Sequence, residues 1–348
     1  MKKLLSMLLV AAMVICLFAG CGQKVEPTVA APETTTAPAE TAAPTTEAPE
    51  TQASEALPRL MVMSGPTGVG AAKLLKDGEG TVIASGEVVE DNESVKNALV
   101  SGEVDIAAIA TNMAATLNNK LGGGLQVLAV NTLGVLYILE KGDTVASMAD
   151  LKGKTLYATG QGANPEYVLN YLLTQNGVEP ADVTIEWLTG QEIIAKMASG
   201  ESGICMLPVP AATTLMMKDE NVRQALSLSE EWDKLGNGAL TQGCIVARTE
   251  YVEQNPNAVE AFLSAYEESI AYMNDEGSRA DAAALVAEFG ITANDKIARK
   301  AIPQCNLVCV RGQEMKDMLI GFYDVLFQAS PAAVGGAIPA DGFYYGVG

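Results

Sequence analysis

Histidine is absent from the 348-residue chain. Its absence excludes Ser-His-Asp and Cys-His nucleophile arrangements, zinc sites with histidine ligands and proton transfer by imidazole. The sequence also has no Ser-x-x-Lys motif, and its acidic pairs are typical of solvated loop charges. We therefore expect no catalytic residue, no metal site and no cofactor, and so a protein that is not an enzyme.

Positive charge is scarce as well. The chain carries 22 Lys and Arg residues against 42 Asp and Glu residues, a formal net charge of -20. A protein this acidic repels phosphate backbones, so we expect no nucleic-acid partner. The sequence offers no basic patch for anionic lipid, so membrane attachment requires a different device.

Long apolar runs are confined to the N-terminus. There, Met1-Lys2-Lys3 and an apolar stretch lead to Leu17-Phe18-Ala19-Gly20-Cys21, a pattern typical of an export signal. The alternative is a plain transmembrane anchor, but the run is short for a span of about 20 residues. The stretch resembles the bacterial lipoprotein signal. That resemblance implies a signal peptide over residues 1–20, a lipid such as palmitate on Cys21, and a location on the outer face of the cytoplasmic membrane.

The next segment, residues 21–57, combines the lipidated cysteine with a stretch of Pro, Thr, Ala and Glu. It contains almost nothing that a core could bury. Such a composition is typical of a disordered tether that holds a domain away from a surface.

Cysteine is sparse. Two of the six belong to the signal, and the other four lack the spacing of a disulfide framework. We expect these four to be buried thiols, although a bridge between the last two remains open if the chain turns between them. The four are Cys205, Cys244, Cys305 and Cys309.

From Arg59 onward, short apolar runs alternate with helical patterns and glycine turns, as in α/β domains with a mostly parallel sheet. The expected strands are 60–63, 81–89, 104–110, one or two within 125–139, 155–158, 183–188, 203–207 and 240–247. The expected helices are 71–76, 93–101, one from 111 onward, 165–175, 192–199, 211–218, 257–274, 279–289, 295–301 and 314–328. Beyond residue 247 the chain is expected to be helical up to a Gly- and Pro-rich tail.

Four predicted loops each follow a strand and precede a helix. The first, residues 65–70, is not a Walker A loop, because Ala71 and Ala72 stand where Lys and Ser or Thr are required. Any one loop alone could be an ordinary turn or cap. Together they would lie at the carboxyl ends of parallel strands, where ligands bind. The predicted ligand-binding residues are Gly65, Thr67, Gly68, Val69, Thr111, Asn112, Thr159, Gly160, Gln161 and Pro208.

None of these loops carries Lys or Arg. Backbone N–H groups, hydroxyls and amides would therefore hold the ligand. This suits a small neutral or modestly anionic solute bound at helix N-termini.

Several segments between residues 59 and about 330 resemble the solute-binding lipoproteins of ABC importers, in the group that binds sulfonates, taurine, nitrate and thiamine precursors. The matching segments are Gly65-Pro66-Thr67-Gly68, Asp105-Ile106-Ala107 ahead of Thr111-Asn112, Met148-Ala-Asp-Leu-Lys-Gly-Lys154 and Glu253-Gln-Asn-Pro-Asn257.

This resemblance implies a periplasmic-binding-protein-like fold of type II, with two α/β lobes that each contain a mixed, mostly parallel sheet flanked by helices. Lobe 1 would comprise residues 59–132 and 243–348, and lobe 2 residues 140–238. Hinge crossings would run through 131–138 and 238–243. A solute that contacts both lobes would favour a closed form, which docks on a permease.

The implied partners are a small-molecule solute, ABC permease and ATPase subunits, and the membrane through the lipid anchor only; the chain is expected to be a monomer. Two rival functions stay open. One is an exported sensor or receptor that displays the lobes as an interface. The other is an exported relative of pyrimidine-precursor synthases, although the chemistry of that family depends on histidine.

Overall fold

The computed structural model describes residues 55–347. The chain divides into two units, Met1–Gln52 and Ala53–Gly348, and the described residues belong to the second. The expected signal peptide, the lipidated Cys21 and the tether up to residue 54 lie outside the described residues.

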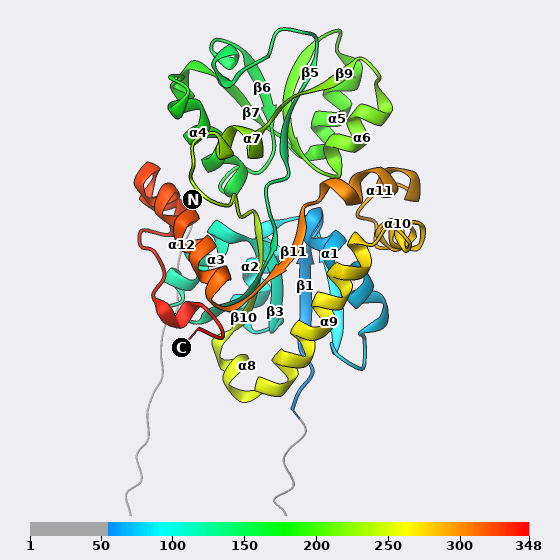
Figure 1. Ribbon diagram of the computed structural model, residues 1–348, viewed down its shortest axis with the longest axis vertical. Helices are drawn as coiled ribbons and strands as arrows, with labels where there is room; N and C mark the ends of the chain where they lie inside the picture. Colours follow the sequence, from blue (N-terminus) through cyan, green and yellow to red (C-terminus); the bar gives the residue numbers. More distant parts are fainter. Residues whose placement is uncertain (1–54, 348) are drawn as a thin grey trace, which may run out of the picture. The chain divides into compact units, whose positions relative to one another are not determined.

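Two mixed sheets flanked by helices organise residues 55–347 (Figure 1). The strand order is β11-β4-β10-β3-β1-β2 in the first sheet and β7-β6-β8-β5-β9 in the second. We call each sheet with its helices a lobe. The chain passes into the second lobe through residues 133–135 (the first crossing) and returns through residues 228–242 (the second crossing).

The first lobe contains two separate parts of the chain. Its strands are β1 (Arg59–Met63), β2 (Ser85–Val89), β3 (Ile106–Ala110), β4 (Leu125–Thr132), β10 (Gly243–Arg248) and β11 (Leu307–Val310). Its helices are α1 (Pro66–Asp77), α2 (Asn92–Ser101), α3 (Thr111–Lys120), α8 (Thr249–Gln254), α9 (Pro256–Asn274), α10 (Arg279–Glu288), α11 (Asp295–Ala301) and α12 (Gly312–Ala329).

The second lobe is built from the intervening chain. Its strands are β5 (Leu136–Lys141), β6 (Thr155–Ala158), β7 (Thr184–Trp187), β8 (Gly203–Pro208) and β9 (Val222–Ser227). Its helices are α4 (Asn164–Gln175), α5 (Gly190–Ser199) and α6 (Ala211–Lys218), and α7 (Leu228–Asp233) opens the second crossing.

The pairing in both sheets is mixed, as expected, but the expectation that each sheet is mostly parallel is wrong, because parallel pairs are not the majority in either sheet. β1 pairs in parallel with β2 and β3, and β6 pairs in parallel with β7 and β8. The strands next to the crossings pair antiparallel: β10 with β3 and β4, β4 with β11, and β5 with β8 and β9. The chain that returns to a lobe thus runs back beside the strand by which it left.

Alternate residues of the central strands face opposite helical layers. On β1, Leu60 and Val62 pack into one buried cluster with Phe262 of α9, whereas Met61 packs into another with Phe322 of α12. A strand buried on both faces needs an uninterrupted apolar run. This explains the Leu-Met-Val-Met sequence of β1.

Two predicted elements begin four or more residues away from their predicted starts. Helix α1 begins at Pro66 rather than at residue 71, because Pro suits the first helical turn and Gly65 before it takes a φ of 111°. Strand β2 begins at Ser85 rather than at residue 81. The preceding residues form a turn in which the amides of Thr81, Val82 and Ile83 donate to the Gly78 carbonyl.

Four of the strands and α-helices were not predicted: β9, α7, α8 and β11. The expectation that the chain beyond residue 247 is helical up to its tail is wrong at β11, which pairs with β4. Both β9 and β11 are edge strands. The sequence of β9, VRQALS, is broken by Arg and Gln and shows no continuous apolar run. The sequence of β11, LVCV, is such a run, but four apolar residues cannot be distinguished from a buried piece of helix by periodicity.

The four cysteines of the described part of the chain are free thiols. Cys205, Cys244 and Cys305 are buried, as expected, and Cys309 is half-buried. Burial raises the pKa of Cys205 and of Cys305 to about 12, so both stay as unreactive thiols. Among residues 55–347, no helix is both long and apolar enough to cross a membrane.

Candidate functional site

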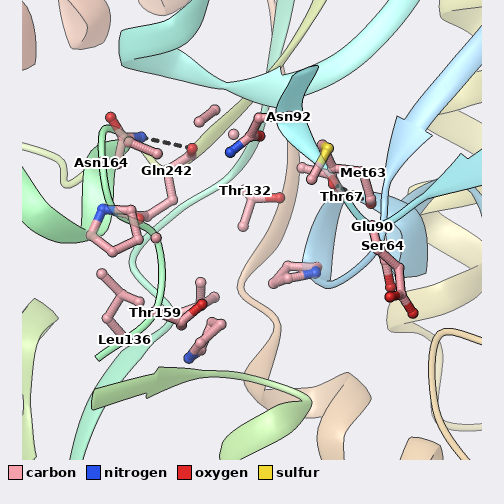
Figure 2. Close-up of a pocket in the computed structure, with 18 of the residues that line it drawn as sticks. Met63, Ser64, Thr67, Glu90, Asn92, Thr132, Leu136, Thr159, Asn164 and Gln242 are labelled. Carbon is pink, nitrogen blue, oxygen red and sulfur yellow. Dashed lines mark hydrogen bonds between the residues drawn. The ribbon is translucent and has the colours of Figure 1, made fainter. Parts of the chain in front are cut away.

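A cavity of about 450 Å³ lies where the two lobes meet (Figure 2). The first lobe contributes Met63, Ser64, Pro66, Thr67, Glu90, Asp91, Asn92, Ala110, Thr132 and Gly243. The second lobe contributes Leu136, Thr159, Gly160, Gln161, Ala163, Asn164, Pro165 and Pro208. Val135 and Gln242 come from the two crossings.

Half of the predicted ligand-binding residues line this cavity. They come from three of the four predicted loops: Thr67, Thr159, Gly160, Gln161 and Pro208. The structure thus brings together loops that are far apart in the sequence, because each follows the carboxyl end of a strand.

Gly65, Gly68 and Val69 do not line the cavity. Helix α1 already begins at Pro66, so Val69 lies one turn inside it and packs in the core of the first lobe. At Gly68, a Cβ atom would lie 2.9 Å from the Met63 carbonyl oxygen. The glycine therefore allows α1 to pack closely against the end of β1.

Thr111 and Asn112 lie behind the cavity wall, fully or almost fully buried. The Thr111 hydroxyl donates to the Thr241 carbonyl at 3.0 Å, and the Asn112 side-chain amide donates to the Ala333 carbonyl at 3.3 Å. Their bonds hold α3 against other parts of the chain.

Sequence reasoning missed the loop after β2, where Glu90, Asp91 and Asn92 line the cavity. In the sequence, the pair Glu90 and Asp91 is typical of charged residues in a solvent-exposed loop. Because β2 runs parallel to β1, the rule used for the other loops would have found it. The Asp91 carboxylate caps α2, and hydrogen bonds from the hydroxyl and amide of Ser94, both 2.7 Å, lower its pKa.

Two polar residues beside the crossings were missed too: Thr132 ends β4, and Gln242 ends the second crossing. The Thr132 side chain is 1% exposed and Gln242 is 8% exposed, yet the hydroxyl of the first and the Nε2 of the second have no hydrogen-bond partner among the described residues. A buried polar group without a partner costs about 1–3 kcal/mol. Figure 2 shows both residues on the cavity wall.

The cavity combines these polar atoms with apolar side chains and with carboxylates at Glu90 and Asp91; its lining includes no Lys or Arg. Among residues 55–347, no group of three or more Cys, Asp or Glu side chains is arranged to hold a metal ion. The arrangement is suited to holding a small molecule by hydrogen bonds and apolar contact.

Two α/β lobes, two crossings and a cavity between the lobes define a binding-protein fold of the two-lobed periplasmic type. The chain belongs to the NMT1/THI5 like family, whose profile matches residues 90–280, more than half of the sequence.

Solved structures share the fold. An ABC transporter protein from Parabacteroides distasonis is 25% identical with a TM-score of 0.69, covering 83% of this chain and 99% of its own. The periplasmic aliphatic sulphonate binding protein of Escherichia coli is 18% identical with a TM-score of 0.67, covering 84% of this chain and 92% of its own.

Among curated proteins, one from Brucella abortus, named as a candidate binding protein, is 24% identical over 172 residues, which is 49% of this chain. The chain spans about half the length of the curated relatives it matches, 51% in this case.

Proposed function

We propose that the protein is the extracytoplasmic solute-binding component of an ABC importer. It would capture a small neutral or anionic organic solute between its lobes and deliver it to a permease. The observation that carries this proposal is the pair of buried, unpartnered polar atoms of Thr132 and Gln242 on the wall of the interlobe cavity. A solute with a hydrogen-bond acceptor would satisfy both and offset the cost of burying them.

Capture requires no chemistry. A solute that contacts both Thr67 of the first lobe and Thr159 of the second stabilises the closed form, in which the two residues lie close enough to bind it together. Its differential affinity for that arrangement sets how far the population shifts toward the closed form. The permease then recognises the closed form.

In this proposal, lobe 1 comprises residues 59–132 and 243–348, and lobe 2 residues 140–238, with hinges at 131–138 and 238–243. The strand membership of the two sheets supports the division. A lipid on Cys21 and the tether after it would hold the monomer at the outer face of the cytoplasmic membrane, beside its permease and ATPase subunits. The N-terminal sequence supports that placement.

A thermal-shift screen tests the proposal. Anionic, zwitterionic and uncharged heterocyclic solutes are titrated against the protein, and each hit is incubated at length and assayed for products. A carrier is stabilised saturably by RT ln(1 + [L]/Kd), about 2.7 kcal/mol at a hundredfold excess over Kd. The solute must also be recovered unchanged. Product formation would contradict the carrier function and support the enzyme alternative.

A further inference from the structure

The Asn164 side chain, at the first position of α4 in the second lobe, is fully buried and bonded to the first lobe. Its Nδ2 donates to the Thr111 hydroxyl and to the Gln242 carbonyl, both at 2.8 Å. Its Oδ1 accepts from the Asn112 backbone amide at 3.2 Å. Figure 2 shows the bond to Gln242 beside the cavity.

These partners fix the orientation of the Asn164 amide. Carbonyl oxygens only accept hydrogen bonds and a backbone amide only donates, so exchanging Nδ2 and Oδ1 would oppose acceptor to acceptor and donor to donor. The amide also satisfies an N–H group of the first turn of α3, which the helix itself cannot bond. A carboxamide matches this set, whereas a carboxylate or an alkyl group of the same size does not.

Thr111 and Gln242, two of the partners of Asn164, are themselves bonded to other parts of the first lobe. The Thr111 carbonyl accepts from the Tyr323 hydroxyl of α12 at 2.9 Å, and both residues are fully buried. The backbone carbonyl of Gln242 also accepts from the backbone amide of Thr111 at 3.3 Å, and the backbone amide of Gln242 donates to the Thr132 carbonyl at 2.9 Å. Asn164 therefore bonds to the start of α3 and to the end of the second crossing, which are themselves bonded to α12 and to β4.

Asn164 also adjoins the parts that must move. It directly follows the loop of Thr159, Gly160 and Gln161, which forms the second-lobe wall of the cavity. Its partner Gln242 lies at the end of the second crossing. In a rotation of one lobe against the other, atoms close to the crossings move least, so short hydrogen bonds can persist there through opening and closing.

We propose that Asn164 is a positioning residue, an interlobe pivot whose amide stays bonded to Thr111, Asn112 and Gln242 while the lobes rotate, and so defines their path of closure. The pivot extends the proposed carrier function, for which lobe rotation is essential. Its test needs no solute, so its failure is distinct from failure of the carrier proposal.

The experiment measures the distance between spin labels on the two lobes of the full chain. Labels are attached at Glu79→Cys and Gln191→Cys, both exposed positions, with the half-buried thiol removed by Cys309→Ser. Asn164→Asp removes the bonds that Nδ2 donates to Thr111, Thr241 and Gln242, and places a carboxylate oxygen against the Gln242 carbonyl. We expect a broader distance distribution, with populations that the parent protein lacks.

The matched control is Asn176→Asp at the other end of α4. The Nδ2 of Asn176 donates to the Leu172 carbonyl at 2.8 Å, a bond within the second lobe. This variant loses a bond of the same type, so its thermal midpoint should fall while its distance distribution stays that of the parent. A merely structural role for Asn164 predicts the same result for both variants.

If Asn164→Asp does not fold, Thr111→Val tests the pivot from the other side, since it removes the hydroxyl acceptor but keeps the branched shape. It should also broaden the distribution, whereas Thr184→Val on an exposed position of β7 should not. A distribution that superimposes on that of the parent, in the folded Asn164→Asp protein or in Thr111→Val, would overturn the proposal.

Discussion

Some buried polar side chains of this protein have hydrogen-bond partners within the chain, whereas others have none. The carboxylate of Glu140 on β5 accepts bonds from the amide and hydroxyl of Thr144 and from the amide of Val145, and pairs with Arg223. The polar atoms of Thr132 and Gln242 at the cavity have no such partners. The first arrangement stabilises the fold, and the second leaves binding capacity for a solute.

Thr132→Val separates these two roles. Val keeps the shape and removes a hydroxyl that no described group satisfies, so the free energy of unfolding should be unchanged or slightly higher. Solute affinity should fall about threefold to tenfold, the loss of one hydrogen bond of about 1 kcal/mol. Calorimetric titration of a solute from the thermal-shift screen measures it, with Thr184→Val as the control. Unaltered affinity would remove Thr132 from the site.

Glu140 predicts a dependence of stability on acid. Burial raises its pKa, but the hydrogen bonds from Thr144 and Val145 and the charge of Arg223 outweigh that effect and hold the pKa below the ordinary 4.5. A lowered carboxyl pKa stabilises the fold above the unfolded-state value, and this stabilisation is lost as pH falls through the folded-state pKa.

Glu140→Gln should therefore lower the free energy of unfolding by about 2 kcal/mol near neutral pH, the value of a hydrogen bond to a charged group. The deficit relative to the parent should shrink below pH 4.5. Urea unfolding at a series of pH values measures it, and Glu201→Gln, at an exposed position, should track the parent. A deficit that is constant down to low pH would contradict the assignment.

At the scale of elements, the cavity depends on how closely β10 packs against β4 and α1. Gly243 opens β10 and pairs with Thr132 of β4. A Cβ atom on Gly243 would lie 2.5 Å from the Asn131 Oδ1 and 2.7 Å from the Thr67 Cγ2. The glycine thus lets strand and helix meet beside the site.

Gly243→Ala should lower the free energy of unfolding by about 1–3 kcal/mol, because neighbouring groups must move to admit the methyl group. It should also weaken solute binding, since Thr67 lines the cavity. Gly321→Ala in α12, where a Cβ would meet no atom within 4 Å, should instead stabilise by about 0.5–1 kcal/mol. Denaturant unfolding compares the two. If Gly243→Ala and Gly321→Ala changed the free energy of unfolding equally, the close packing of β10 against β4 and α1 would not be what requires glycine at position 243.

The elements also explain how far the sequence could predict the site. The positions of Thr67, Thr159 and Pro208 at the cavity were predictable because each lies at or just after the carboxyl end of a strand, and the carboxyl ends of parallel strands share an edge of the sheet. Thr132 and Gln242 were not, because they meet only through the antiparallel pairing of β4 with β10. These strands are more than a hundred residues apart, and nothing in their local sequence encodes that register. Asn164 was missed for the same reason, since its partners are on other elements.

At the scale of the whole molecule, the proposed carrier function requires attachment to the outer face of the membrane as well as the two-lobed fold. Cys21 lies outside the described residues, so its role rests on the export signal that precedes it. Cys21→Ser should release the protein from the membrane fraction into the medium or periplasm, because the variant would lack the proposed lipid. Fractionation followed by immunoblotting measures this. A variant that stays with the membrane would contradict the lipid anchor and favour a spanning N-terminal segment.

In the proposed function, the two lobes close over the cavity and so capture a solute. The most direct test is the interlobe distance between labels at Glu79→Cys and Gln191→Cys, measured without solute and with a solute at a concentration that saturates its thermal shift. We expect the solute to narrow the distribution to a single, shorter distance. A distribution that stays the same at saturation would contradict capture by closure.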